Sequence, residues 1–336
     1  MTTNPTRAAV IGLGVGEQHA RALKNIDGCE VTRLIDVDIQ QAERLADVFP
    51  GARLSTNPDD ALKDPDVDIV SIASPDDAHF DQVMTGLAHK KALFVEKPLC
   101  RSLGELEKIK NAWETAGCPA LDSNLVLRSA PLWRWLKEAI RSGELGEIYA
   151  IDAEYLYGRI HKITEGWRKN VENYSVLQGG GVHMLDLMLG LTEQRPSSVQ
   201  AFGNGICTKG TAFKYNDFMA ATYRFPSGLI GRLTANYGCV HKHHHILRVY
   251  GTKATFLYDD AGPRLHSTRS ETAKASYIEH NPLPGHKGDL LPDFIRLIRN
   301  GGDTRPLANR NFDLIKTVVA ADTAARENRE VEINYM

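Results

Sequence analysis

The segment ALFVEKPLC, residues 92–100, places a lysine between a glutamate and a proline directly after an apolar run. The apolar residues predict a short buried strand, and Pro98 ends that strand one residue past Lys97. An ammonium group held in this way can hydrogen-bond an alcohol or carbonyl oxygen and stabilise negative charge that develops on it. Lys97 is therefore a candidate catalytic residue, and a surface lysine whose stem lies along the protein is the alternative.

A second reactive side chain, His183, stands at the start of the helical segment VHMLDLMLGL, residues 182–191. Imidazole has an ordinary pKa of about 6.5, so it can accept or return a proton near neutral pH. The positive end of a helix dipole at this position favours the neutral, basic form. Asp186, three residues on, shares the helical face and could orient the ring or oppose that effect. A satisfied structural histidine is the alternative interpretation.

A glycine-rich segment, residues 10–23, joins an apolar run to a helical pattern. The pyrophosphate of a dinucleotide rests at the N-terminus of such a helix, where glycines let the backbone approach it. The third glycine comes one residue earlier than in the usual fingerprint, and a tight turn without a ligand is the alternative. The candidate cofactor-binding residues of this loop are Gly12, Leu13, Gly14, Val15 and Gly16.

Asp36 ends the next predicted strand, about 20 residues further on, where a ribose-binding acid is expected. A carboxylate there accepts hydrogen bonds from the ribose 2′-OH and repels a 2′-phosphate, and its neighbour Val37 adds no positive charge. The pattern therefore favours NAD over NADP, with a solvated acid at a strand end as the alternative.

Two more loops leave the carboxyl ends of predicted parallel strands, SPDDAH at residues 74–79 and EKP at residues 96–98. Ligands of open α/β sheets bind outside these ends, so both loops are expected to face the cofactor. Their candidate cofactor-binding residues are Ser74, Pro75, His79, Glu96 and Lys97.

The elements that must position these residues alternate between strand and helix up to residue 122. Helical patterns occur at residues 17–26, 38–49, 77–90 and 102–117, with short apolar runs between them. This alternation predicts a doubly wound parallel sheet, a Rossmann domain spanning residues 1–122.

The remaining residues, 123–336, are expected to form an α+β domain with a large, mostly antiparallel open sheet. Strand patterns occupy residues 147–158, 218–225, 229–238 and 245–259, and turns of hairpin type separate them. Helical segments at 182–191 and 312–327 interrupt or follow these strands.

Residues 155–170 are rich in aromatic and basic side chains, which suit a polyhydroxylated and even anionic ligand. The substrate-binding candidates are Tyr157, Arg159, Trp167 and Arg168 from this segment, together with Lys97, Arg128, His183 and Asp186. An exposed basic loop is the alternative interpretation of the segment.

The histidine run HKHHH would place His241, His243 and His245 on one face of a strand. No carboxylate or cysteine stands at ligand spacing, so we expect a wet sheet face or a subunit contact and no metal.

Composition excludes several classes of protein. The net charge is −2 for 336 residues, which favours neither a nucleic-acid partner nor an anionic membrane. No apolar run approaches the roughly 20 residues that a membrane helix needs. The five cysteines lack CxxC spacing, and no secretory signal pattern opens the sequence, so a cytoplasmic protein is expected.

The chain resembles the Gfo/Idh/MocA family of NAD(P)-dependent oxidoreductases in six motifs that occur in the same order. They are the glycine loop, SPDDAH, VEKPL, the passage at residues 124–148, GGGVHMLDLMLGL and RVYGTKATF. The resemblance implies two domains, a homodimer or homotetramer built through the C-terminal sheet, and Lys97 and His183 beside the nicotinamide and the reacting carbinol. Many members carry an aspartate four residues before this histidine, where the present chain has Gly179; Asp186 is the nearest acid in sequence.

We therefore expect an NAD-dependent oxidoreductase that acts on a sugar, a cyclitol or a sugar derivative such as a uronate or nucleotide sugar. Lys97 would polarise the carbinol oxygen, and His183 would act as acid and base. The alternatives are a glycosidase or epimerase that retains NAD, and a dinucleotide sensor without catalysis.

Overall fold

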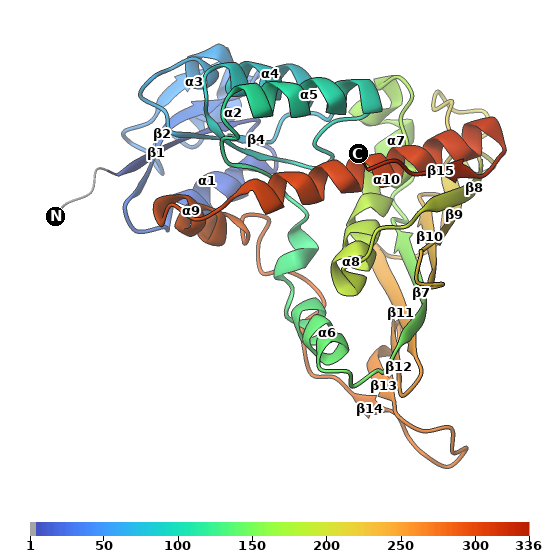
Figure 1. Ribbon diagram of the computed structural model, residues 1–336. Coiled ribbons are helices and arrows are strands. Elements are labelled where there is room, and N and C mark those ends of the chain that lie inside the picture. The colour runs from blue at the N-terminus through green and yellow to red at the C-terminus, as the bar shows by residue number, and fades with distance from the viewer. Residues whose placement is uncertain (1–4, 336) are drawn as a thin grey trace. The chain divides into compact units, whose positions relative to one another are not determined.

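The computed structural model describes residues 5–335 (Figure 1). The chain forms two compact units: the first contains the residues up to Val126 together with Pro284–Ile315, and the second contains Leu127–Leu283 and the residues from Lys316 onward. The first crossing lies four residues beyond the predicted boundary at 122. The prediction placed all of residues 123–336 in one domain, whereas segment 284–315 returns to the first unit.

The first unit is built on a six-stranded parallel sheet with the strand order β3-β2-β1-β4-β5-β6. This is the doubly wound order in which both halves start from the centre of the sheet. Its strands are β1 (Thr6–Ile11), β2 (Cys29–Ile35), β3 (Arg53–Ser55), β4 (Ile69–Ile72), β5 (Ala92–Val95) and β6 (Leu121–Ser123). Its helices are α1 (Gly16–Lys24), α2 (Ile39–Glu43), α3 (Asp59–Leu62), α4 (His79–Ala88), α5 (Leu103–Thr115) and α9 (Leu291–Arg299). In Figure 1, α1 lies beside α9, and α4 lies beside α5.

Helix α9 belongs to the first unit because of its apolar side chains. Leu291, Phe294 and Ile295 are buried in the same core cluster as residues of β1 and β2. The rings of Phe294 and Phe94 lie 5.6 Å apart. Burying each of these side chains contributes roughly 1.5–3 kcal/mol, which holds the segment on this sheet despite its distance in sequence.

The predicted helix at residues 38–49 is wrong in its length, because α2 ends at Glu43. Beyond α2, backbone hydrogen bonds join residues that are three apart, as from the Leu45 N–H to the Ala42 carbonyl. Leu45 and Phe49 are nevertheless buried in the core. The apolar positions were therefore correctly identified, although tight turns rather than a helix carry them inward.

The second unit is built on a nine-stranded sheet with the order β14-β13-β12-β11-β7-β10-β9-β8-β15. Strands β7 and β10 pair in parallel, and the other neighbours are antiparallel, as predicted. The strands are β7 (Ile148–Leu156), β8 (Ser198–Asn204), β9 (Phe218–Arg224), β10 (Ile230–Asn236), β11 (His244–Gly251), β12 (Thr255–Asp259), β13 (Gly262–His266), β14 (Ser276–Tyr277) and β15 (Val331–Glu332).

Short helical elements connect and cover this sheet. They are the 3₁₀ turns η1 (Val126–Ser129) and η2 (Trp167–Asn170), the π-helical turn η3 (Leu177–Gly181), and helices α6 (Pro131–Arg141), α7 (His161–Thr164) and α8 (Val182–Thr192). The long helix α10 (Arg305–Glu327) belongs to the first unit up to Ile315 and to the second unit from Lys316 onward. Helix α8 packs on β7 and β10, and α6 packs on α8. Side chains on the other sheet face include the exposed Phe202 and Ile230.

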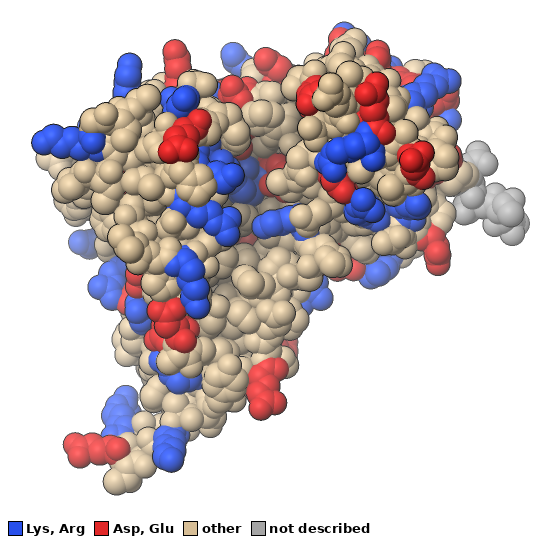
Figure 2. Space-filling view, turned by 180° about the vertical axis from the view of Figure 1, so that it is seen from behind, with Lys and Arg blue, Asp and Glu red and all other residues tan. Residues whose placement is uncertain are grey.

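Charge is distributed evenly on the surface that Figure 2 displays, where Lys and Arg side chains are interspersed with Asp and Glu. Within residues 5–335, none of the helices combines the length and apolarity that a bilayer crossing requires. Over the same residues, all five cysteines are free thiols.

Candidate active site

Two glycines of the first loop are required by their surroundings. Gly12 has φ +83°, and a Cβ there would lie 2.5 Å from the Ala73 carbonyl oxygen, so no other residue fits without strain. Gly16 begins α1, and a Cβ there would lie 2.9 Å from a methyl carbon of Val10. Gly16 thus allows the close packing of helix on strand that the last glycine of the fingerprint normally allows, although it comes one residue early.

The residues between these glycines leave the loop open on one side. A Cβ on Gly14 would meet nothing within 4 Å. The Leu13 side chain is fully buried, so only its backbone serves the loop, and Val15 is 41% exposed. Open space over a bare backbone at a helix N-terminus is the arrangement that a pyrophosphate requires. The loop therefore fits a dinucleotide.

Asp36 is fixed against this loop by two backbone donors. Its Oδ2 accepts a hydrogen bond of 2.7 Å from the Leu13 N–H, and its Oδ1 accepts one of 3.0 Å from the Asp38 N–H. The Leu13 carbonyl accepts a bond of 3.2 Å from Arg44, a cation near Asp36 that the sequence pattern did not indicate. Arg44 pairs with Glu17 at 2.6 Å, and Glu17 also pairs with Arg21 at 2.9 Å.

The loop after β4 is tied to the loop after β5 by a histidine. His79 has no exposed surface. Its Nδ1 lies 2.7 Å from the Pro98 carbonyl oxygen, and its Nε2 lies 3.0 Å from the Ser74 carbonyl oxygen. The expectation that His79 contacts the cofactor therefore requires correction, because both ring nitrogens are engaged and the residue positions the two loops instead. Pro75 is exposed in the same loop.

A buried polar network lies beside Lys97 at the end of β5. Glu96 Oε1 accepts a hydrogen bond of 2.7 Å from Asn124 and lies 3.3 Å from Nε2 of His19, whose Nδ1 lies 2.8 Å from the Ser71 hydroxyl. Burial raises the pKa of Glu96, but His19, the Lys97 charge and Asn124 outweigh it and bring that pKa to about 2. Glu96 is therefore an anion beside the candidate catalytic lysine.

Sequence reasoning found Glu96 but missed its partners. His19 lies inside the first predicted helix, and Asn124 lies more than a hundred residues further along the chain. The only available signal was a histidine on the apolar face of α1, which more often indicates packing than a site.

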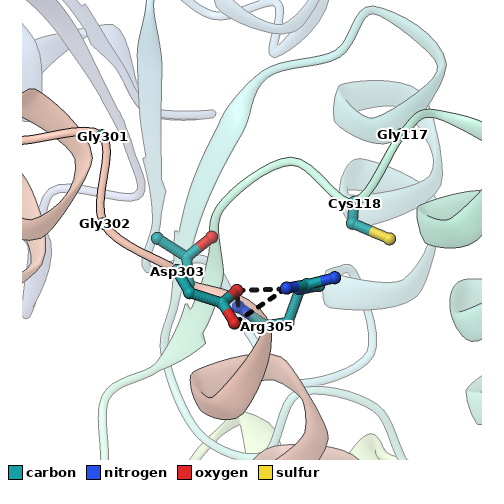
Figure 3. Close-up of a pocket in the computed structure, with 7 residues that line it drawn as sticks. Gly117, Cys118, Gly301, Gly302, Asp303 and Arg305 are labelled. Carbon is teal, nitrogen blue, oxygen red and sulfur yellow. Dashed lines mark hydrogen bonds and ion pairs between the residues drawn. The ribbon is translucent and has the colours of Figure 1, made fainter.

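Figure 3 shows a pocket of the first unit that lies away from the glycine loop and has a volume of about 510 Å³. An ion pair between Arg305 and Asp303, with a shortest distance of 2.8 Å, borders it together with Cys118. Gly117 and Cys118 connect α5 to the start of β6, so the cavity lies at the amino ends of the strands. It is therefore separate from the glycine loop at their carboxyl ends.

In the second unit, two of the predicted substrate residues bind each other. Arg128 donates from Nε to Asp186 Oδ2 at 2.9 Å and from a terminal nitrogen to Oδ1 at 2.8 Å. Asp186 is 1% exposed, and the pair anchors η1 to α8. A bidentate buried pair of this kind is strong and directional. The predicted contact of Arg128 and Asp186 with substrate stays a prediction, and the structure adds that the two side chains bind each other.

The other candidates of this unit meet in one aromatic cluster with His183. The guanidinium of Arg159 lies 5.6 Å from the Tyr157 ring centre, and that of Arg168 lies 4.4 Å from the Trp167 ring centre. Sequence reasoning missed other members of this cluster, which are Tyr155, Tyr174, Tyr237, His243 and His245.

Tyr155 is the centre of the cluster. Its ring is stacked on His183 with centres 6.3 Å apart, on Tyr157 at 5.8 Å, and lies 5.4 Å from His245. Tyr155 and Tyr157 are two residues apart on an extended chain, so the alternation of side chains was the signal that could have identified Tyr155. The combination of flat rings, guanidinium groups and an imidazole can hold a polyhydroxylated molecule.

The histidine run divides differently from the prediction. Strand β11 begins at His244, so the alternation does not extend back to His241, whose Nε2 pairs with Asp260 at 2.9 Å. The ring centres of His243 and His245 lie 5.0 Å apart, and His245 is buried with its ring near that of Tyr155. The wet sheet face was therefore wrong for His245. Among residues 5–335, no group of three His, Cys, Asp or Glu side chains could hold a metal ion.

The chain matches two domain models of one family. Residues 6–121 match the Gfo/Idh/MocA oxidoreductase family with an NAD-binding Rossmann fold, and residues 133–257 match its C-terminal domain. The chain therefore belongs to the Gfo/Idh/MocA family, and the first unit is its NAD-binding domain.

Several curated relatives are inositol 2-dehydrogenases. One from Arthrobacter sp. (strain FB24) is 31% identical over 200 residues, which cover 59% of this chain and 57% of that protein. One from Rhodococcus jostii (strain RHA1) is 35% identical over 149 residues, 44% of this chain and 40% of that protein. The chain thus spans about half the length of these relatives.

Solved structures share the whole fold at low identity. Levoglucosan dehydrogenase, in complex with NADH and levoglucosan, superposes with a TM-score of 0.85 at 19% identity over 99% of this chain and 100% of that one. Myo-inositol 2-dehydrogenase from Lactobacillus plantarum gives 0.82 at 20% identity, over 98% and 100%. These matches confirm the predicted fold class.

Proposed function

We propose that this chain is an NAD-dependent oxidoreductase that interconverts a secondary alcohol and a ketone on a sugar, a cyclitol or a derivative of either. The observation that carries the proposal is the first loop, in which Gly12 admits no side chain and Asp36 accepts the Leu13 N–H at 2.7 Å. Family membership and the names of the relatives support the same reaction class.

The cofactor would be held by backbone and carboxylate groups of the first unit. The backbone from Gly12 to Gly16 would receive the pyrophosphate, Asp36 the ribose hydroxyls, and the loops at Ser74, Pro75 and Glu96 the nicotinamide end. Bound NAD supplies the two-electron acceptor of the reaction. Asp36 makes NADP the less favoured cofactor, because its carboxylate repels a 2′-phosphate.

Lys97 and His183 would divide the remaining chemistry between them. The Lys97 ammonium would donate to the carbinol oxygen and stabilise its developing charge. His183 would take the hydroxyl proton during oxidation and return it during reduction. Glu96, an anion in the folded protein, adjoins this lysine at the end of β5.

The substrate would contact the aromatic cluster of the second unit. Tyr157 and Trp167 offer flat rings on which a sugar or cyclitol can pack, and Arg159 and Arg168 offer donors for hydroxyls or a carboxylate. Two arginines favour substrates that carry an anionic group, such as uronates. The inositol and levoglucosan named for the relatives are neutral ring polyols of similar size.

A substrate screen tests the proposal. We expect NADH absorbance to increase with at least one member of a panel of inositols, aldoses and uronates. The Lys97→Ala variant should lower kcat at least a hundredfold while NAD affinity stays nearly unchanged, and Lys110→Ala on the outer face of α5 is the matched control. Substrate conversion without net NADH, or a binding defect without a kcat defect in Lys97→Ala, would overturn it.

We also propose that two or four copies associate through the open face of the second sheet. That face combines exposed Phe202 and Ile230 with ion pairs such as Arg248 to Glu154 at 2.7 Å. Light scattering during size-exclusion chromatography should give a dimer or tetramer for the wild type. Phe202→Glu with Ile230→Glu should give a smaller species, and a monomeric wild type would refute the assembly.

A further inference from the structure

The glycine run that precedes His183 is packed against tyrosines. A Cβ on Gly179 would lie 2.0 Å from the Tyr174 hydroxyl oxygen and 3.1 Å from that of Tyr237. A Cβ on Gly180 would lie 2.2 Å from a ring carbon of Tyr155. The space that side chains at positions 179 and 180 would occupy is therefore filled by groups from elsewhere in the unit.

The Tyr174 hydroxyl is itself fixed from two sides. Arg168 donates to it from Nε at 3.1 Å, and the Tyr237 hydroxyl shares a hydrogen bond with it. Tyr174 is 6% exposed and Tyr237 is 1% exposed. Burial raises the pKa of Tyr237 well above its ordinary value, so this hydroxyl stays neutral. The Tyr174 hydroxyl is therefore a buried hydrogen-bonding group in a fixed position beside a permanent cation.

This hydroxyl lies one helical turn before His183. Side chains four residues apart on a helix are neighbours, about 5–6 Å between their Cβ atoms, and helical side chains lean toward the N-terminus. These preferences would direct the imidazole of His183 toward the position that Tyr174 fills. Tyr155, in contact with Gly180 and stacked on His183, limits the ring on its other side.

We propose that Tyr174, held by Arg168 and Tyr237, is the positioning residue for His183 and supplies the polar group that Gly179 cannot supply. This inference rests on the proposed function, because it assigns His183 the acid and base role. It also means that the polar partner one turn before the imidazole is a neutral phenol beside a guanidinium, with no carboxylate at that position.

The acids close to α8 and to the glycine run are engaged by other groups. Asp322 of α10 accepts hydrogen bonds from Ser175 and Gln178. The nearest acid on the helix, Asp186, is paired with Arg128, which reaches it from η1. Helix α6 contributes Lys137 and Arg141, and both pair with Glu193 at the far end of α8. Strand β7 presents Tyr155, and Tyr237 follows β10.

The test replaces the Tyr174 hydroxyl, which occupies the space beside Gly179, by an aspartate side chain at position 179. Tyr174→Phe removes only the hydroxyl, and Tyr258→Phe, at the same 6% exposure on β12, is the matched control. Gly179→Asp alone cannot fit beside Tyr174, but Tyr174→Ala makes room for it. The double variant Tyr174→Ala with Gly179→Asp therefore places a carboxylate where the phenol was.

Two readouts separate a positioning role from a packing role. In the cofactor-free protein, NMR of labelled histidines follows the titration of the His183 imidazole, identified by the signal that His183→Gln removes. With substrate, the pH profile of kcat/KM follows the same group in turnover. Circular dichroism melting shows that each variant is folded.

We expect Tyr174→Phe to lower kcat about tenfold, because His183 loses the group that orients it, with the KM for NAD unchanged and Tyr258→Phe equal to wild type. The double variant should recover activity relative to Tyr174→Ala. It should also raise the His183 titration midpoint and the acidic limb of the profile by about 1 pH unit or more. A Tyr174→Phe enzyme with wild-type kcat and profile, or a double variant without a shift, would overturn the inference. A wild type that forms no NADH with any substrate would instead refute the proposed function, and the NMR titration would still test the effect of Tyr174 on His183.

Discussion

Gly12 and Gly14 are two residues apart in the same loop, yet alanine should have opposite effects at the two positions. Gly12→Ala introduces a side chain in the left-handed region at φ +83°, with its Cβ 2.5 Å from the Ala73 carbonyl oxygen. Gly14→Ala introduces the same methyl group where no atom lies within 4 Å and the backbone is not left-handed. The pair therefore separates what the loop needs for folding from what it needs for the cofactor.

The magnitudes follow from these contacts. A left-handed conformation costs a non-glycine residue about 1–2 kcal/mol, and the backbone shift away from Ala73 adds about 1 kcal/mol or more. At about 2–4 °C per kcal/mol for a unit of this size, Gly12→Ala should lower Tm by about 5–12 °C. Gly14→Ala should keep or raise Tm, because a compatible Gly to Ala change stabilises by about 0.4–1 kcal/mol.

For NAD binding, the Gly14 position is the important one. A methyl group on Gly14 stands where the pyrophosphate must approach the helix N-terminus, and losing one charged hydrogen bond there costs about 1.5–3 kcal/mol. Gly14→Ala should therefore weaken NAD binding at least about tenfold. Melting of the cofactor-free proteins by circular dichroism and calorimetric titration with NAD measure the two effects. A Gly14→Ala protein that binds NAD like wild type would refute the placement of the pyrophosphate, and an unchanged Tm for Gly12→Ala would refute the strain argument.

Three further predictions concern the cofactor preference, the core and the pH dependence. Asp36→Ala should weaken NAD binding and narrow the preference over NADP, and titration with both cofactors that shows unchanged selectivity would contradict the assignment. Phe294→Ala should cost about 3–5 kcal/mol in urea unfolding, against less than about 0.5 kcal/mol for the exposed Leu103→Ala control; similar values for both would contradict the membership of α9 in the first core. Desolvation raises the pKa of Asp322 to about 6 although Ser175 and Gln178 donate to it, so the contribution of Asp322 to the free energy of unfolding should rise as pH falls from about 6 to about 4. Asp322→Asn should remove that contribution, so the Tm of the wild type relative to the variant should increase as pH falls over this range, and a constant difference would contradict the assignment.

Much of the fold could be predicted because its elements carry local signals. Strand β5 and residues 8–11 of β1 are continuous apolar runs, as buried parallel strands should be. The helix at 38–49 was too long because apolar spacing cannot distinguish a helix from successive tight turns that bury the same side chains. The return of segment 284–315 to the first unit could not be predicted, because the buried face of α9 does not specify which sheet covers it.

The candidate site was predictable only where a residue belongs to a motif. The glycines and Asp36 follow a spacing set by the cofactor's dimensions, and the structure holds them together by hydrogen bonds within one loop region. His79 was misassigned because its motif position fits a ligand contact equally well. Only the burial of both ring nitrogens, against carbonyls of two loops, identifies it as a support.

The glycines show most clearly where sequence reasoning stops. A glycine in the sequence shows that no side chain is present, but the neighbouring residues do not show which group of the folded protein occupies that space. At Gly12 a left-handed turn packed against Ala73, which follows the neighbouring strand β4, requires glycine, and the motif is sufficient to infer it. At Gly179 and Gly180 the space is filled by Tyr174 and Tyr155, and the latter comes from a strand more than twenty residues earlier. A position that lacks a side chain can therefore still carry a functional group, because the fold can bring that group from another segment.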